Sequence, residues 1–193
     1  VACIRSGQED LDEHRQQPAW AEAKTYLTLA KNFTRPARPF LLITHGYSGS
    51  GKTTATQYLV EHSSAIRIRS DVERKRLFEL APHERSQSGL NAGIYSPDAH
   101  NQTYRHLEKM AREILQTGFP VIVDATFLKR ADREPFKILA NMLQVPFYIL
   151  HLHADKPTLH QRIIDRQKSE KDASEATRQV LEQQVQNSEE LTH

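Results

Sequence analysis

The sequence has almost no cysteine and no long apolar run, and each absence excludes a class of protein. Cys3 is the only cysteine among the 193 residues, so an internal disulfide and a multi-cysteine zinc site are both excluded. No stretch approaches the roughly 18 apolar residues that a membrane-spanning helix needs. We therefore expect a cytoplasmic protein with no membrane partner.

The chain also lacks a strong excess of either charge. Lysine and arginine number 26 against 24 aspartates and glutamates, which gives a formal net charge of +2. A surface that binds duplex nucleic acid through many phosphate contacts needs a larger basic excess. Nucleic acid is therefore not the partner that we expect, and any such contact must be local.

The first 37 residues differ in pattern from the rest of the chain. Apolar residues recur at helical spacing from Pro18 to Asn32, and the prolines of the stretch Thr34–Pro39 then break the pattern. We interpret residues 1–37 as a helical lead-in. It either packs on its own domain or forms the junction with a preceding domain, while residues 38–193 make up the main domain.

The main domain alternates short apolar runs with amphipathic stretches. The apolar runs predict four strands, at Phe40–His45, Ala65–Arg69, Pro120–Asp124 and Phe147–Leu152. The amphipathic stretches predict helices at Lys52–Ser63, Val72–Leu80, Pro97–Gln116, Ala131–Leu143, Pro157–Lys168 and Ser174–Asn187. This alternation predicts an α/β fold with helices on both faces of a parallel sheet, and ligands beyond the carboxyl ends of the strands.

The strongest motif lies directly after the first expected strand. Residues Gly46–Thr53 fit the phosphate-loop pattern G-x-x-x-x-G-K-[ST], between an apolar run and a helical pattern as that motif requires. We expect Lys52 to reach the outer phosphates of a nucleotide and Thr53 to hold Mg²⁺. The predicted nucleotide-binding residues are Gly46, Tyr47, Ser48, Gly49, Ser50, Gly51, Lys52, Thr53 and Thr54.

An acidic residue ends the third expected strand. Asp124 follows three apolar residues, the usual position of an acid that supports Mg²⁺, so we predict a metal site at Thr53 and Asp124. The alternative for Asp124 is a cap or turn role. The next residue is Ala125 rather than Glu, which disfavours an ATP-hydrolysing motor. The chain also lacks the guanine-reading motif of GTPases and the His-Arg-Asp set of protein kinases.

Asp71, just after the second expected strand, is the candidate general base. A hydroxyl acceptor must lie in line with the γ-phosphate, and a carboxylate can accept its proton. Arg74 lies three residues on, so it can face the same site and contact an anionic part of the acceptor. The alternative makes Asp71 an N-cap, with Ser70 as a rival, and Glu73–Arg76 a solvated charged face.

Basic residues also follow the two later strands, and they are Lys129, Arg130, Arg133, Arg162, Arg166 and Lys168. We predict that Arg162 and Arg166, at i and i+4, close on the transferred charge and that Arg130 and Arg133 bind the acceptor. The same spacing also fits ordinary surface residues. Residues 168–175 are polar and aperiodic, as in a lid, and the loop 81–98 is a candidate cover for the acceptor.

Taken together, these motifs resemble a known group of kinases. The resemblance covers about residues 38–185, and it lies in the phosphate loop, Arg69-Ser-Asp71-Val-Glu-Arg74-Lys, Tyr95-Ser-Pro-Asp98, Val123-Asp-Ala-Thr126-Phe and Arg162–Gln167. The group is the P-loop kinases that include polynucleotide kinase, zeta toxin and chloramphenicol phosphotransferase. Within it, the chain looks most similar to the ATP-binding domain that follows an aminoglycoside-phosphotransferase-like domain in many bacterial proteins.

The resemblance implies a P-loop nucleoside triphosphate hydrolase fold with a five-stranded parallel sheet sandwiched by helices. It also implies ATP and Mg²⁺ as the donor, Asp71 as the base, Arg74 as an acceptor contact and Arg162 or Arg166 as a lid arginine. We therefore expect an ATP-dependent kinase that phosphorylates a hydroxyl of a small-molecule or nucleotide-like acceptor. The alternatives are a regulatory ATP-binding module that controls a neighbouring domain and a kinase of nucleic-acid 5′-hydroxyls.

Overall fold

The computed structural model describes residues 13–34, 38–82, 84–86, 88–89, 91–169 and 173–191. The chain divides into two compact units, residues 1–37 and residues 38–193. In the first unit, helix α2 (Glu13–Thr34) is longer at both ends than the helix that the sequence predicts. No helix in the described ranges is both long and apolar enough to cross a membrane.

In the second unit, the described residues form four strands and six α-helices. The strands are β1 (Leu41–His45), β2 (Ile66–Arg69), β3 (Val121–Asp124) and β4 (Phe147–His151). The helices are α3 (Lys52–His62), α4 (Ser70–Leu77), α5 (Pro97–Gln116), α6 (Arg130–Met142), α7 (Lys156–Ser169) and α8 (Arg178–Gln186), with the 3₁₀ turn η1 (Gly93–Tyr95) before α5. The strands and α-helices lie within a few residues of their predicted ranges, α5 agrees at both ends, and η1 lies in the stretch 81–98 that the sequence predicts as a loop.

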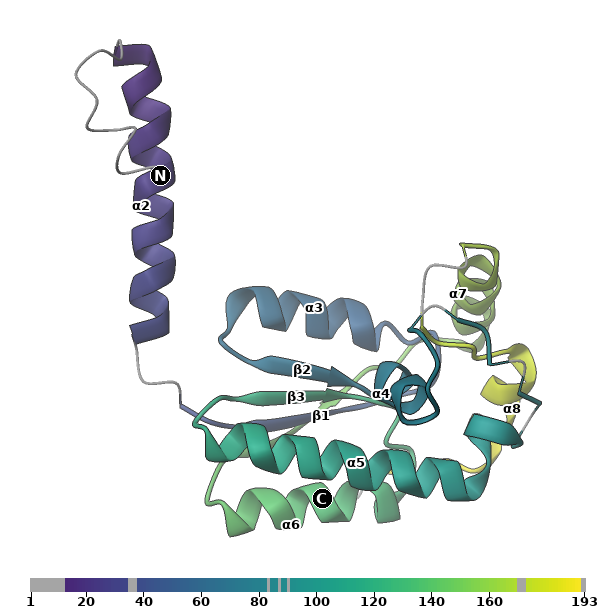
Figure 1. The fold of residues 1–193 in the computed structure, drawn as a ribbon. Helices are drawn as coiled ribbons and strands as arrows, with labels where there is room; N and C mark the ends of the chain where they lie inside the picture. The colour runs from purple at the N-terminus through teal and green to yellow at the C-terminus, as the bar shows by residue number, and fades with distance from the viewer. Residues whose placement is uncertain are drawn as a thin grey trace. The chain divides into compact units, whose positions relative to one another are not determined.

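The strands form one parallel sheet in the order β2-β3-β1-β4. Helix α3 covers one face and helices α5 and α6 cover the other, so the predicted α/β sandwich is confirmed (Figure 1). The expectation of five strands is wrong for the described part of the chain, where the sheet has four. The physical reason is that the chain has four apolar runs of strand type, and after β4 it continues into the polar sequence of α7.

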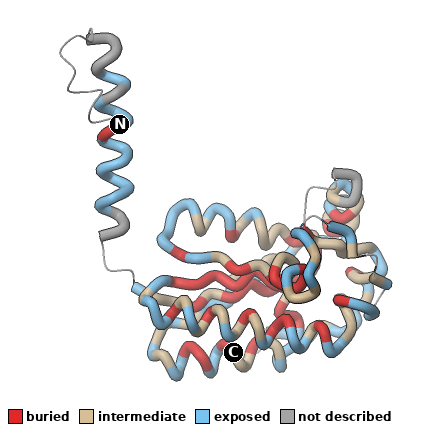
Figure 2. Tube along the Cα trace, viewed as in Figure 1, coloured by how far each residue is buried: buried red, intermediate tan, exposed pale blue. Residues whose placement is uncertain are grey.

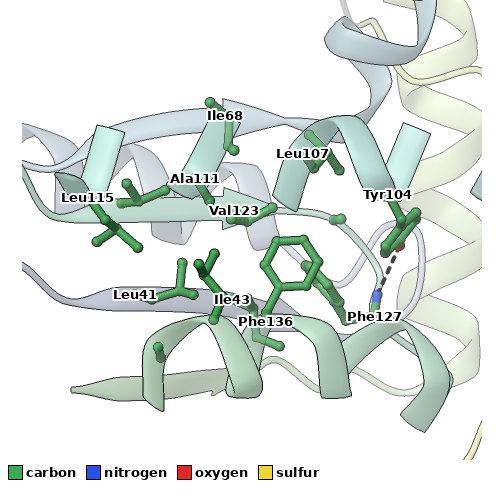
Figure 3. Packing of buried hydrophobic residues seen from close by; sticks show 14 residues of the cluster. Leu41, Ile43, Ile68, Tyr104, Leu107, Ala111, Leu115, Val123, Phe127 and Phe136 are labelled. Atoms are coloured by element: carbon green, nitrogen blue, oxygen red, sulfur yellow. Dashed lines mark hydrogen bonds between the residues drawn. The ribbon is translucent and has the colours of Figure 1, made fainter. Parts of the chain in front are cut away.

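The hydrophobic core lies between the sheet and helices α5 and α6, where buried residues face each other across the layers (Figure 2). Leu41 and Ile43 of β1 pack there with Phe136 of α6 (Figure 3). Phe127, in the loop after β3, has a φ of 47°, which an L-residue seldom adopts. Edge-on contacts with the rings of Tyr104 and Phe136 hold it there, with centroids 5.2 and 5.0 Å away. This packing fixes the loop that leaves β3.

Four helices of the second unit begin at other residues than the sequence predicts, α6 and α7 by one position and α4 and α8 by more. Helix α4 starts at Ser70, directly after β2, so Asp71 lies in its first turn rather than before it. Helix α8 starts at Arg178 rather than Ser174, because the hydroxyl of Thr177 caps it by accepting from the amide of Val180 at 3.3 Å. Of the predicted lid, residues 170–172 lie outside the described residues, as do positions 83, 87 and 90 of the predicted cover loop.

The carboxyl ends of the strands all point toward one end of the sheet, as they must in a parallel sheet. Helices α4, α7 and α8 gather at that end, at the tips of the strand arrows (Figure 1). In parallel α/β folds this is the edge where ligands bind.

Candidate nucleotide and acceptor site

A cavity of about 1000 Å³ opens at this edge of the sheet. Its walls come from the phosphate loop, the ends of β2 and β3, helix α4, the turn η1 with the start of α5, and helices α7 and α8. A volume of this size is at the upper end of the range for one bound small molecule. It therefore suits two ligands lying side by side.

The phosphate loop joins β1 to α3 and depends on its glycines. Gly46 and Gly49 have φ angles of 151° and 85°, in the region that favours glycine. A Cβ on Gly46 would lie 2.4 Å from the carbonyl oxygen of Leu152, and one on Gly49 would lie 3.0 Å from that of Leu159. No other residue fits these positions without displacing backbone. Of the nine predicted nucleotide-binding residues, six line the cavity, and these are Ser48, Gly49, Gly51, Lys52, Thr53 and Thr54.

Lys52 lies at the N-terminus of α3, with its ammonium turned back onto the loop. The Nζ atom donates to the carbonyl oxygens of Gly46 and Tyr47 at 2.9 and 2.8 Å. Burial lowers the pKa of Lys52 to about 8, against the opposing pull of the Asp124 and Asp71 carboxylates. Both acids are thus within electrostatic reach of this ammonium, as is Arg166, which lowers the pKa further.

The structure brings Thr53 and Asp124 together. The Thr53 hydroxyl donates to Asp124 Oδ2 at 3.0 Å, and the buried hydroxyl of Thr56 donates to the same oxygen at 3.3 Å. Burial raises the pKa of Asp124, although the charge of Lys52, the hydrogen bond from Thr53 and the charge of Arg69 partly oppose the shift. A hydroxyl and a carboxylate oxygen are hard oxygen donors of the kind that Mg²⁺ prefers, so the residues present fit a magnesium ion.

Asp71 and Arg74 also line the cavity, from the first turns of α4. One donor of the Arg74 guanidinium is already used inside the protein, because Nη1 donates to the carbonyl oxygen of Ile94 at 3.0 Å. It also lies over the ring of Tyr95, 5.2 Å from the centroid. Arg74 therefore fixes the turn η1 against α4, and this places Tyr95 in the cavity wall.

The six basic residues after the later strands do not all converge. Arg162 of α7 donates to the carbonyl oxygen of Gly49 at 3.1 Å, and Arg162, Arg166 and Lys129 all line the cavity. Arg130 and Arg133 do not line it. Arg130 is exposed and pairs with Glu134 on its own helix at 3.8 Å. The side chain of Lys168 lies outside the described residues.

Arg133 has a structural contact instead of a place at the cavity. Its buried guanidinium donates to the carbonyl oxygens of Phe127 and Glu190, at 2.9 and 3.2 Å. These bonds join α6 to the loop after β3 and to the last described residues of the chain. The predicted role of Arg133 in acceptor binding is therefore corrected to a structural one, because its donors are already used inside the protein.

Sequence reasoning missed several residues at the cavity. Gln184 of α8 holds the phosphate loop, since its Oε1 accepts from the Ser48 amide at 2.9 Å and its Nε2 donates to the Ser48 hydroxyl at 3.1 Å. His100 pairs with Asp132 at 3.0 Å in the wall near Tyr95. No motif contains these residues, so only the Tyr95-Ser-Pro-Asp98 stretch of the resemblance pointed to this wall.

The comparison with curated proteins finds distant relatives. The uncharacterized proteins Rv2004c of Mycobacterium tuberculosis and Mb2027c of Mycobacterium bovis are each 28% identical over 127 residues. The match covers 66% of this chain and 24% of each relative. The chain thus spans about a quarter of the length of the curated relatives that it matches.

Solved structures share the fold. An RNA repair complex, Pnkp1/Rnl/Hen1, contains a chain with a TM-score of 0.60 and 19% identity, over 79% of this chain and 45% of that one. A gluconokinase from Sinorhizobium meliloti 1021 gives a TM-score of 0.55 and 19% identity, over 80% and 77%. A sugar kinase from Janibacter sp. HTCC2649 gives 0.57 and 18%, over 80% of each chain.

A protein-family model also matches the chain. It is described as AAA domain and matches residues 41–191, from the first residue of β1 to the last described residue of the chain. The predicted P-loop nucleoside triphosphate hydrolase fold is therefore confirmed. Because the match covers well over half of the sequence, the chain belongs to this AAA domain family.

Proposed function

We propose that this protein is an ATP-dependent kinase that transfers the γ-phosphate of ATP to a hydroxyl of a small-molecule or nucleotide-like acceptor. The observation that carries the proposal is the approach of three groups around one cavity. Lys52 and Asp124 lie on the nucleotide side, and Asp71 faces them from α4, close enough that its charge acts on Lys52. An anion site, a metal-holding acid and a separate carboxylate are the parts that phosphoryl transfer needs.

The phosphates of ATP bind to the amides of the loop and of the N-terminus of α3, where the helix dipole favours negative charge. Lys52 turns from the carbonyl oxygens of Gly46 and Tyr47 to the outer phosphates. Thr53 and Asp124 would hold Mg²⁺, which would neutralise phosphate charge. Arg162 and Arg166 extend from α7 toward the same phosphates and stabilise charge on the transferred group.

Transfer of the phosphoryl group also requires a base that takes the proton of the acceptor hydroxyl. The acceptor hydroxyl oxygen forms a bond to the γ-phosphorus while the bond between that phosphorus and the β,γ-bridging oxygen breaks, and ADP leaves. The hydroxyl proton goes to the carboxylate of Asp71. Arg74 and Tyr95 shape the wall in which the acceptor lies. Since the chain has no acid at Ala125 to activate water, transfer to the acceptor is favoured over hydrolysis.

The test is an acceptor screen with γ-³²P-labelled ATP and Mg²⁺. The panel contains gluconate and other sugars, nucleosides, aminoglycosides and 5′-hydroxyl oligonucleotides, and Lys52→Ala is the binding-deficient control. We expect label to move to one class of acceptor and to stay on ATP with the control. The solved relatives include both sugar kinases and an RNA repair complex, so the panel must contain both chemistries.

A second candidate function is a regulatory ATP-binding module. It is supported by the size of the curated relatives, of which this chain spans only 24%. Under this second function, the module follows an aminoglycoside-phosphotransferase-like domain in the full-length protein. Binding of ATP to the module then controls the activity of that neighbouring domain. ATP binding in the full-length protein without label transfer to any acceptor, together with loss of the neighbour's activity in Lys52→Ala, would favour this function over the kinase.

A further inference from the structure

Helix α4 carries a lysine that is almost completely buried. Lys75 is 1% exposed, and its Nζ donates to the Glu175 carboxylate at 3.0 Å and to the carbonyl oxygen of Pro82 at 3.1 Å. Glu73 and Arg74 are buried as well, so only Arg76 of the charged run Glu73–Arg76 is exposed to solvent. Burying an ion pair rarely stabilises a fold, because desolvation offsets the attraction of the charges. The pair thus calls for a role besides stability.

The partner of Lys75 in this ion pair, Glu175, lies 100 positions later in the sequence. It precedes α8 and accepts from Lys75, from the Ser86 amide at 3.0 Å and from the Ser86 hydroxyl at 2.6 Å. Burial alone would raise the pKa of Glu175, but the hydrogen bonds from Ser86 and the charge of Lys75 hold it below its usual range. The residue is therefore a carboxylate at neutral pH, tied to α4 and to the loop before η1.

The stretch of chain that begins near Glu175 and contains α8 also contacts the phosphate loop, at its C-terminal end. Besides the two hydrogen bonds between Gln184 and Ser48, the Tyr47 hydroxyl lies 2.8 Å from the Ser188 hydroxyl. Between the two ends, Leu181 packs with residues of α7 and is 1% exposed. Residues 173–188, which we call the α8 segment, thus join α4 to the phosphate loop by two sets of polar contacts across a packed centre.

We propose that Glu175 and Lys75 are positioning residues that couple the nucleotide-bound state of the phosphate loop to the placement of Asp71 and Arg74. This inference rests on the proposed kinase function, in which those two residues of α4 meet the acceptor. Nucleotide binding orders the loop at Ser48, the α8 segment follows through Gln184, and the ion pair carries the effect to α4. The catalytic carboxylate is then held in place when ATP is bound.

The experiment compares wild type with Glu175→Gln, Lys75→Met and the double variant. Glu182→Gln is the matched control, because Glu182 is an exposed glutamate of α8 outside the cavity. The double variant removes both charges, so it keeps the test valid if Glu175→Gln folds poorly beside a buried ammonium. The probe is adenylyl imidodiphosphate with Mg²⁺, and the readout is amide hydrogen exchange at residues 46–54 and 70–77.

In wild type and Glu182→Gln, we expect the analogue to slow exchange both at the phosphate loop and along α4. In the pair variants, the slowing at the loop should persist and the slowing at α4 should disappear. Turnover of an identified acceptor should fall about tenfold or more with little change in KM for ATP, because a small misplacement of reacting groups is costly. The double variant should be no worse than the single ones, since both remove the same contact.

Two results would overturn the inference. One is unchanged slowing at α4 in both Glu175→Gln and the double variant. The other is loss of slowing at the phosphate loop itself, as in Lys52→Ala, which would make the pair part of the nucleotide site or of the fold. Because hydrogen exchange needs no acceptor, failure of every acceptor in the screen would contradict the kinase function and leave this coupling to be decided separately.

Discussion

The hydroxyl of Thr53 donates to the carboxylate of Asp124 at 3.0 Å, although 71 positions separate the two residues in the sequence. The contact exists because β1 and β3 are neighbours in the sheet, so the residues that follow β1 meet the last residue of β3. Two oxygen donors with this spacing would form part of an octahedral magnesium site. The remaining ligands would come from phosphate and water.

Asp124→Asn should therefore lower the affinity for Mg²⁺, so that turnover needs a higher Mg²⁺ concentration, without unfolding the protein. The amide keeps one oxygen but loses the charge, and loss of a supporting carboxylate typically lowers metal affinity or activity about 10- to 100-fold. Mg²⁺ titration of ATP turnover measures the effect, with Asp98→Asn as an exposed control on α5. An unchanged Mg²⁺ midpoint in Asp124→Asn would remove this residue from the metal site.

ATP affinity should fall as the pH rises from 7 to 9. Burial lowers the pKa of Lys52 to about 8, so the ammonium that meets the phosphates is present below that pH and lost above it. Above pH 8, the loss approaches about tenfold for each pH unit. Binding of a fluorescent ATP analogue across this range measures it. Lys52→Met should bind weakly with no such slope, and an equal slope in that variant would assign the titration to another group.

Arg130 and Arg133 provide a matched pair that separates surface from structural roles. Arg133→Met removes the hydrogen bonds to the carbonyl oxygens of Phe127 and Glu190 and should lower the free energy of unfolding by about 2 kcal/mol. Arg130→Met removes an exposed ion pair and should change it by less than about 0.5 kcal/mol. Urea denaturation of both variants is the measurement. Equal stability of the two would contradict the structural role of Arg133.

Much of the fold and half of the site follow from local patterns. The phosphate loop and Asp124 could be predicted because each lies directly after an apolar strand, and parallel strands bring such positions to one edge. Lys75 could not, because a lysine in a charged run has the same pattern whether it faces solvent or a buried carboxylate. The contact between Ser48 and Gln184 spans 136 positions and involves an amide side chain that belongs to no motif. The structural contacts of Arg133 could not be predicted either, because an arginine on a helix has the same pattern whether it faces a cavity, solvent or backbone carbonyl oxygens.

Tyr95→Phe should weaken acceptor binding specifically. The Tyr95 hydroxyl is buried and has no hydrogen-bond partner among the described residues, and burial raises its pKa well above the usual range. The phenol therefore stays protonated and available to an acceptor oxygen. Loss of one such bond should raise the acceptor KM about tenfold and leave KM for ATP unchanged. Steady-state kinetics test this, with the exposed Tyr58→Phe as control; an unaltered acceptor KM would exclude the contact.

The central claim is that Asp71 accepts the proton of an acceptor hydroxyl, and one comparison tests it most directly. Turnover of the acceptor found in the screen is measured for wild type, Asp71→Asn and Asp98→Asn, together with ATP affinity for each. The account predicts that Asp71→Asn loses about 100-fold or more in kcat while ATP affinity stays within about threefold, because general-base catalysis contributes about 10²–10⁴. Asp98→Asn should match wild type. Full turnover in Asp71→Asn would contradict the account.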